Sequence, residues 1–211
     1  MTNHEMSPEE MEAQLEARNR AGRAIRDLSH AVVGRQAEVA LINEVANTLG
    51  ALVGRLEQAP QRVRDPLSFP SWEGTPADGE PIMTFADRPI SGTASPYGVD
   101  LVSFRDGDEA VARFTLRPAH EGAPGRSHGG IVSAIFDDVL GFVLQIHEVP
   151  GFTGELTVRY EAGTPIGREL EMRARLDRRE GRKLFMSSEL LDGATRVASA
   201  RAIFIHREFT D

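Results

Sequence analysis

Residues 131–146 form a stretch in which most positions are apolar, and no other part of the chain constrains the fold as strongly. In a helix, these side chains would cover most of the circumference, which is typical of a helix buried on nearly all sides. Asp137 and Asp138 are the exceptions. An ionised carboxylate in apolar surroundings is costly unless it has a partner, so each must lie at an exposed edge or be held there for chemistry.

Length and charge narrow the classes of protein. The 211 residues are enough for one domain of ordinary size with an appendage, or for two small domains. A net charge of -8 argues against nucleic acid as the main partner, because phosphate binding needs a basic surface.

Residue usage gives three further expectations. The chain has no cysteine, which excludes disulfides and thiolate chemistry. Its first residues show no basic segment followed by an apolar core, and no apolar run reaches the ~20 residues of a membrane span. We therefore expect a soluble cytoplasmic protein with no membrane partner. Lys183 is the only lysine among 24 basic residues, a bias that suggests a bacterial genome.

The first 59 residues are predicted to form a helical extension. Ser7 can cap a helix whose first position suits Pro8, and Glu10 can complete a capping box, so a helix should run to about Leu28. A second amphipathic helix follows Gly34. Its apolar residues recur at steps of three and four: Val39, Ile42, Val45, Leu49, Leu52 or Val53, and Leu56. We expect this pair to dock on the main domain or on a partner subunit; a membrane-surface helix fits less well because the polar face is not basic.

Residues 60–96 are rich in Pro, Gly, Ser and Asp, with Phe69, Trp72 and Phe85 scattered among them, which predicts an ordered extended segment. Residues 97–211 are predicted to form the main domain. Two strand-like runs, 99–104 and 110–116, surround a turn at 105–108, and a loop at 118–127 leads to the apolar helix.

Four more strands are predicted after the helix. They cover residues 156–160, 170–176, 184–191 and 196–206, with turn residues between them. Two strands, one buried helix and four strands describe an α+β domain in which an antiparallel sheet wraps around a long central helix.

Several groups of residues in this domain resemble the hot-dog-fold thioesterases, in particular their phenylacetate-degradation-like (PaaI-like) branch, which acts on acyl-coenzyme A. The matching groups are the run from Glu121 to His128-Gly129-Gly130, Asp137 with Gly141, Thr153 with residues 156–160, and the run 180–185. The resemblance covers about residues 97–207 and implies a hot-dog fold. It leaves the first ~95 residues outside, so no function is inferred from them.

Thioester hydrolysis needs hydrogen-bond donors for the carbonyl oxygen and a carboxylate that attacks the thioester or activates water. The unpaired N–H groups at the start of the central helix can supply the donors, and the two glycines permit a close approach. The resemblance assigns the donor to Gly129 and the catalytic carboxylate to Asp137. It places His128 and Gly130 beside the substrate, and it aligns Thr153 with a hydroxyl that positions the attacking water.

Helix geometry separates the two carboxylates. Asp137 shares a stripe of small residues with Ser133 and Gly141, where a ligand could pass close to the backbone, whereas Asp138 points ~100° away. We therefore expect Asp138 to contact the loop or the N-terminal helices. The alternatives are that Asp137 pairs with a nearby arginine and that Thr153 is an ordinary residue at the start of a strand. Some relatives carry an amide side chain six residues before the histidine; this chain has Gly122 there.

The spacing along the helix predicts the assembly. Gly129 and Asp137 are eight positions apart, which places them about 12 Å apart along the axis. One thioester carbon cannot contact both within one chain. Two helices running antiparallel past each other would bring Gly129 of one subunit to Asp137 of the next, so we expect a homodimer with two equivalent sites, which can pair further into a dimer of dimers.

A basic turn is the candidate for binding the phosphates of coenzyme A. It contains Arg178, Arg179, Arg182 and Lys183. A solvated hairpin turn is the alternative for any one of them. The histidines have no spacing that resembles a zinc site, so we expect no metal, and coenzyme A only as part of the substrate.

The leading hypothesis is an acyl-CoA thioesterase with Asp137 as general base or nucleophile. A second is a hot-dog protein that binds acyl-CoA or another small ligand without turning it over. A third is the hydratase or dehydratase chemistry found elsewhere on this fold, which would require a different pattern of histidine and acid around His128.

Overall fold

The computed structural model describes residues 7–62 and 74–207. His4, Phe69 and Trp72, which entered the sequence argument, lie outside the described residues, and so does the middle of the segment 60–96.

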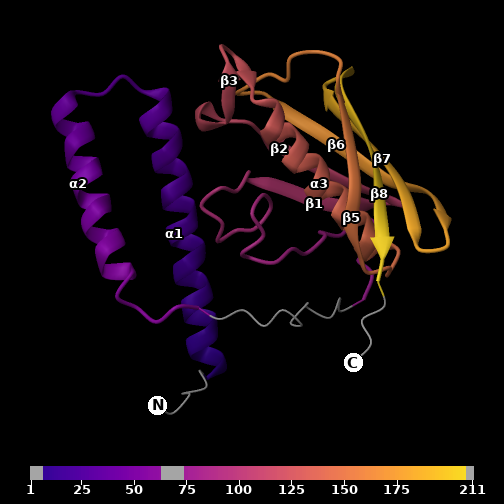
Figure 1. Cartoon of the computed structure of the whole chain (residues 1–211), viewed down its shortest axis with the longest axis horizontal. Helices are drawn as coiled ribbons and strands as arrows, with labels where there is room; N and C mark the ends of the chain where they lie inside the picture. The colour runs from indigo at the N-terminus through magenta and orange to yellow at the C-terminus, as the bar shows by residue number, and fades with distance from the viewer. Residues whose placement is uncertain (1–6, 63–73, 208–211) are drawn as a thin grey trace.

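The domain is built on one antiparallel sheet of six strands, in the order β1-β2-β6-β7-β8-β5 (Figure 1). The strands are β1 (Leu101–Asp106), β2 (Glu109–Thr115), β5 (Gly151–Tyr160), β6 (Glu169–Glu180), β7 (Lys183–Asp192) and β8 (Thr195–His206). Sequence neighbours pair as hairpins, except that β2 pairs with β6 and β5 lies beyond β8 at the edge. The predicted strand order along the chain is confirmed.

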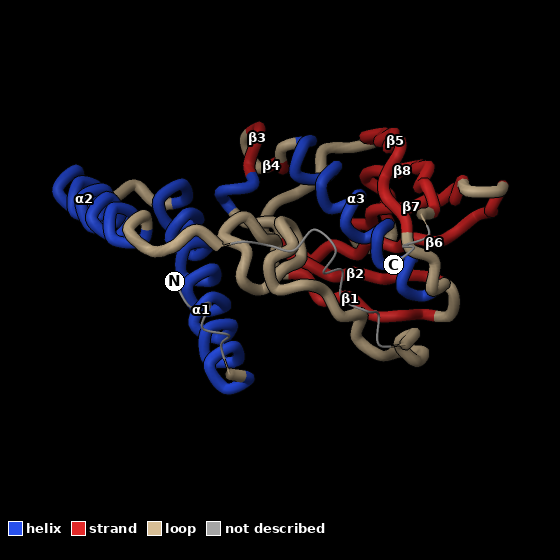
Figure 2. The backbone as a smooth tube through the Cα atoms, turned by 60° about the horizontal axis from the view of Figure 1, so that its bottom comes forward, coloured by secondary structure: helices blue, strands red, loops and turns tan. Residues whose placement is uncertain are grey.

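The apolar helix is α3 (Gly129–Ile146), and it crosses one face of the sheet (Figure 2). Ten of its residues are buried, among them Phe136, Val139 and Leu140. Alternate residues of the strands face it: in β7, Leu184, Met186 and Leu190 are buried. Among the described helices, α3 is the one long and apolar enough to cross a membrane by length and composition. Its burial against the sheet accounts for that apolarity.

Three local predictions differ from the structure. The loop predicted at 118–127 contains a 3-10 turn, η1 (Pro118–His120), and a small hairpin of β3 (Glu121–Ala123) and β4 (Arg126–Ser127). The first turn is shorter than predicted, because Asp106 pairs with Glu109. β5 begins at Gly151 rather than at 156, because its first residues continue the ladder with the end of β8 across a bulge between Thr153 and Glu155.

The helical extension consists of α1 (Pro8–Gly34) and α2 (Val39–Leu56). The capping box at Ser7 and Glu10 is confirmed, with both hydrogen bonds formed. α1 continues past the predicted end near Leu28, because its last turns pack on η1 through His30, whose Nδ1 accepts the Ala119 N–H. Figure 1 shows α1 lying between the sheet domain and α2.

α1 is fixed to the domain by a buried arginine. Arg26 is 3% exposed and donates to the carbonyl oxygens of Thr93 (3.1 Å) and Ser95 (2.5 Å) and to Asp100 (2.8 Å). Hydrogen bonds from Nη1 and Nη2 offset much of the cost of burying the guanidinium, so these three contacts hold α1 against the segment before β1. The expected docking of the helical pair is therefore seen for α1, whereas α2 has no buried residue.

Candidate active site

The start of α3 is organised by His128, which is its N-cap residue, with φ -66° and ψ 133°. Its Nδ1 accepts the Gly130 N–H at 3.0 Å, so in the neutral ring the proton is on Nε2. The Gly130 N–H is thereby occupied. The Gly129 N–H has no acceptor among residues 7–62 and 74–207, and it remains available at the positive end of the helix.

The small hairpin and η1 position this N-cap. The His128 N–H donates to the His120 carbonyl at 2.8 Å. A Cβ on Gly122 would lie 2.7 Å from the His128 Cα, which leaves no room for a side chain. Some relatives carry an amide side chain at this position. Here the backbone of Gly122 packs directly against His128, so only glycine fits.

His120 itself is buried at the junction of η1 and α1. Its ring lies edge-on to His30, with centroids 4.7 Å apart, and its Nδ1 accepts the Arg117 N–H. Burial, with smaller effects of His30 and Arg117, lowers the pKa of His120 to about 4. Burial also lowers the pKa of His30, and in both rings the unprotonated Nδ1 accepts a backbone N–H.

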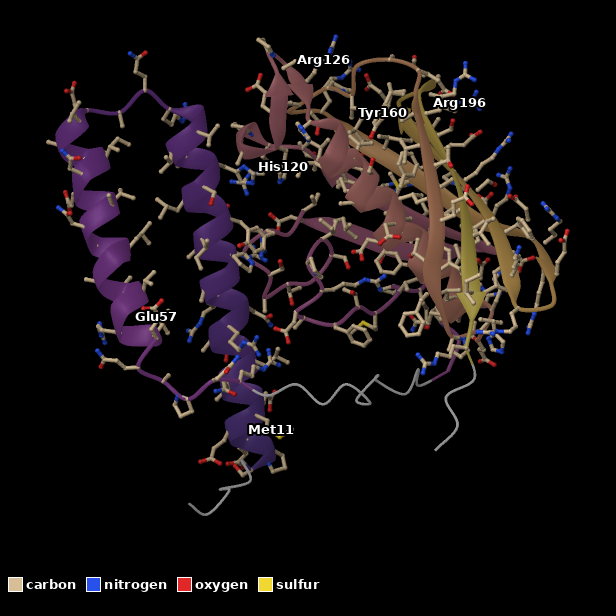
Figure 3. All side chains as sticks on the ribbon, viewed as in Figure 1. Met11, Glu57, His120, Arg126, Tyr160 and Arg196 are labelled. Carbon is tan, nitrogen blue, oxygen red and sulfur yellow. The ribbon has the colours of Figure 1, made fainter. Side chains whose placement is uncertain are left out.

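Tyr160, at the end of β5, ties the strand to the start of α3, and the sequence argument gave it no role. Its hydroxyl donates to the Gly129 carbonyl at 2.7 Å and lies 2.6 Å from the Ser133 hydroxyl. The side chain is 48% exposed, at the rim of the helix start (Figure 3). The only sequence signal was its place at the end of the strand that follows Thr153.

Asp137 and Thr153 come together from two elements. Thr153, near the start of β5, donates its hydroxyl to Asp137 Oδ1 at 2.7 Å. Asp137 is half-buried and Thr153 is exposed, so the pair is open to solvent. A carboxylate and a hydroxyl at the surface of an apolar helix can together bind a water molecule beside them.

Asp138 has a different environment. It is 7% exposed and forms an ion pair with Arg88, which also donates to the Asp138 carbonyl at 3.3 Å. The same guanidinium lies 5.1 Å from the centre of the Phe142 ring. Asp138 has the expected polar contact, but its partner lies in the segment 60–96 and not in the loop at 118–127 or the N-terminal helices. The nearby arginine that was the alternative for Asp137 pairs with Asp138 instead.

The predicted small-residue stripe does not form an open channel. The Arg88 guanidinium lies directly against the Cα of Gly141, where a Cβ would clash with it, and Tyr160 covers Ser133. The prediction that a ligand could pass along this stripe is wrong. It was based on α3 alone, and the side chains of Arg88 and Tyr160 from other segments cover the two ends of the stripe. Glycine at 141 makes room for the arginine that neutralises Asp138.

The basic turn joins β6 and β7 at the end of the sheet that carries Thr153. Strand register shows this, because Thr153 is opposite Phe204 and Phe204 is opposite Leu184. Arg178 pairs with Glu180 and stacks on Phe185. Arg179 and Arg182 donate to backbone carbonyls of Gly181 and His206, and Lys183 is exposed. Their assignment to coenzyme A stays a prediction.

The site of one chain therefore has two separate halves. Gly129, His128 and Tyr160 lie at the start of α3, and Asp137 with Thr153 lies about 12 Å further along its axis.

A family model described as the thioesterase superfamily matches residues 125–199, which include the start of α3, Asp137 and Thr153. This domain is therefore similar to the thioesterase superfamily. The crystal structure of another thioesterase superfamily protein aligns with a TM-score of 0.73 at 24% identity, over 89% of this chain and 94% of that one. The likeness shows that the thioesterase domain has the hot-dog fold, as the resemblance implied.

Curated relatives of the thioesterase domain are acyl-coenzyme A thioesterases. THEM4 of Bos taurus is 30% identical over 112 residues, which are 51% of this chain and 46% of the relative. THEM5 of Mus musculus is 26% identical over 105 residues, 49% of this chain and 42% of the relative. This chain spans about half the length of the curated relatives it matches.

Proposed function

We propose that the protein hydrolyses acyl-CoA thioesters to a free acid and coenzyme A, in sites that two chains build together. The proposal rests on one observation. Asp137 on α3 accepts a hydrogen bond from Thr153 on β5, far along the helix from the Gly129 N–H, which has no acceptor among the described residues. Similarity to the thioesterase superfamily and the names of its acyl-CoA relatives support the substrate class.

The edge strand β5 supports the assembly. β5 ends the sheet order, and Phe152 and Tyr160 on it are 41% and 48% exposed. An open edge strand is a template for pairing with another chain. Antiparallel pairing of β5 with β5 of a second copy brings the Thr153 end of one strand toward the Tyr160 end of the other. Each site then combines Asp137 and Thr153 of one protomer with the helix start of its partner.

In such a site the thioester carbonyl oxygen accepts the Gly129 N–H, where the helix dipole stabilises the negative charge that develops during attack. Asp137 either takes a proton from a water that attacks the carbonyl carbon, or attacks it directly and is released by water in a second step. Thr153 holds the carboxylate or the water in place. The carbon–sulfur bond breaks, and the coenzyme A thiolate takes up a proton.

Hydrolysis of acyl-CoA by the full chain, followed through the released thiol over short, long and aromatic acyl groups, tests the proposal. Because the carboxylate takes part in bond formation, Asp137→Asn should lower kcat by about 100-fold or more. Asp108→Asn, in the exposed turn between β1 and β2, is the matched control and should retain wild-type activity.

Two outcomes oppose this function. If Asp137→Asn hydrolyses acyl-CoA with the wild-type kcat, the Asp137 carboxylate has no part in the reaction. Binding of CoA esters without turnover for every acyl group supports the alternative of a non-catalytic binding protein.

A further inference from the structure

α2 is an apolar helix in which the described residues bury no side chain and leave only Val45 half-buried. Between Val39 and Leu56 its only charged residues are Glu44 and Arg55, and none of its residues is buried. Its large apolar side chains stay accessible to solvent: Val39 74%, Leu41 52%, Ile42 37%, Leu49 39%, Leu52 43%, Val53 51% and Leu56 74%. Folded proteins seldom leave a continuous apolar surface of this kind in water, so this face of α2 calls for a partner.

The spacing of the apolar residues is that of a helix that packs along another helix. Ile42, Val45, Leu49, Leu52 and Leu56 follow one another at alternating steps of three and four. This is the heptad spacing of a coiled-coil seam. Val39 and Val53 widen the seam on one side. A helix lying over a sheet or a flat surface has no need of such a narrow repeat.

The charges indicate which partner fits. A membrane-surface helix carries several basic residues on its polar face, whereas α2 carries Arg55 alone. Glu44 lies in the first half of the helix and Arg55 in its last turn. If two copies of α2 run antiparallel, each glutamate lies toward the arginine of the other copy. A parallel pair would place like charges side by side.

We propose that α2 pairs antiparallel with α2 of a second copy of this chain, through the seam of Ile42, Val45, Leu49, Leu52 and Leu56. The pairing is independent of the catalytic residues, which lie on α3 and β5. It gives the helical extension the role of holding copies together.

The antiparallel arrangement fixes which positions meet. Leu49 is near the middle of the seam, so the two Leu49 side chains lie near the two-fold axis. Ile42 is seven residues away, about 10 Å along the axis, which places the two Ile42 side chains about 20 Å apart. Asn47 has a similar height along the axis as Leu49 but lies on the opposite face of the helix.

The absence of cysteine makes a clean cross-linking experiment possible. Three full-length variants, Leu49→Cys, Ile42→Cys and Asn47→Cys, are treated with a short bismaleimide at low protein concentration. Pairing raises the local thiol concentration, so we expect about tenfold more cross-linked dimer for Leu49→Cys than for the other two. Asn47→Cys controls for the face of the helix, and Ile42→Cys controls for its direction.

Each other pattern overturns the proposal. Equal cross-linking of Ile42→Cys and Leu49→Cys indicates parallel helices. Equal and low cross-linking of all three variants means that another occupant covers the seam. A Leu49→Glu substitution should abolish the pairing of α2 helices, whereas Asn47→Glu should leave it intact. Both variants should hydrolyse acyl-CoA as the wild type does. Loss of activity in wild type and variants alike would count against the proposed function and not against this pairing.

Discussion

Two neighbouring carboxylates on α3 have different partners, and the proposed function gives a catalytic role to Asp137 alone. Asp138 is buried, and Arg88 places the opposite charge beside it. Asp137 is half-buried, and its hydrogen-bond partner is the uncharged hydroxyl of Thr153. A carboxylate paired with an arginine is a poor base, whereas one held by a hydroxyl keeps its charge for a reacting group. At the scale of the residue, the proposed function therefore treats Asp137 and Thr153 as one unit.

Replacement of Thr153 tests that unit. Thr153→Val keeps the shape of the side chain and removes the hydroxyl, so we expect kcat to fall by about tenfold or more while KM changes little. Thr153→Ser should restore most of the rate. Thr157→Val, on the same strand but on the open face of the sheet, is the matched control. A Thr153→Val enzyme as fast as the wild type would show that the hydroxyl has no part in the reaction.

At the scale of the element, η1 links the helical extension to the active site. Its last residue, His120, contacts His30 of α1 on one side and accepts the His128 N–H on the other. The same turn carries Arg117, which pairs with Asp27 of α1. The docking of α1 and the position of the α3 N-cap residue therefore both depend on the short segment Pro118–His120.

The buried His120 predicts how stability depends on pH. In the folded protein the pKa of His120 is about 4, against an ordinary value of 6.5. Between these two pH values, the imidazole is protonated in the unfolded chain but not in the folded protein. The free energy of unfolding should therefore fall as the pH falls below 6.5, by about 2 kcal/mol from this group at pH 5. Urea unfolding at pH 7.5 and pH 5 measures the loss.

His120→Asn isolates this contribution, because an amide oxygen can still accept the Arg117 N–H but does not titrate. The variant should lose about 2 kcal/mol less than the wild type over the same pH interval. If both proteins lose the same amount, His120 is not the group responsible.

The sequence predicts those elements whose pattern is local. The apolar circumference of 131–146, the capping box at Ser7 and the alternation in the strands each report burial or hydrogen bonding within a few residues. Asp137 was singled out by its place on the helix and by the resemblance. Arg88 lies 50 positions before Asp138 and Tyr160 lies 31 after Gly129, so these pairs arise only from the packing of distant segments.

At the scale of the whole molecule, the two halves of the active site lie on one helix but too far apart to act on one thioester. The proposed function therefore requires two chains in each site. Two contacts are proposed at the two ends of the molecule: β5 builds the active sites, and α2 holds copies together.

A mixture of two inactive chains tests whether each active site is shared between two chains. Gly129→Pro removes the N–H donor, and a proline suits the first position of a helix after the extended His128. Gly129→Ala, which adds a Cβ 3.2 Å from the Tyr160 hydroxyl but keeps the N–H, is its control. Loss of one oxyanion donor should lower kcat by about 100-fold or more.

Co-expression of Gly129→Pro chains with Asp137→Asn chains gives hybrid dimers in which one of the two sites has both groups intact. We predict that acyl-CoA hydrolysis by the random mixture returns to about a quarter of the wild-type rate, far above either variant alone. A mixture no more active than the average of the two separate variants would contradict a site shared between chains.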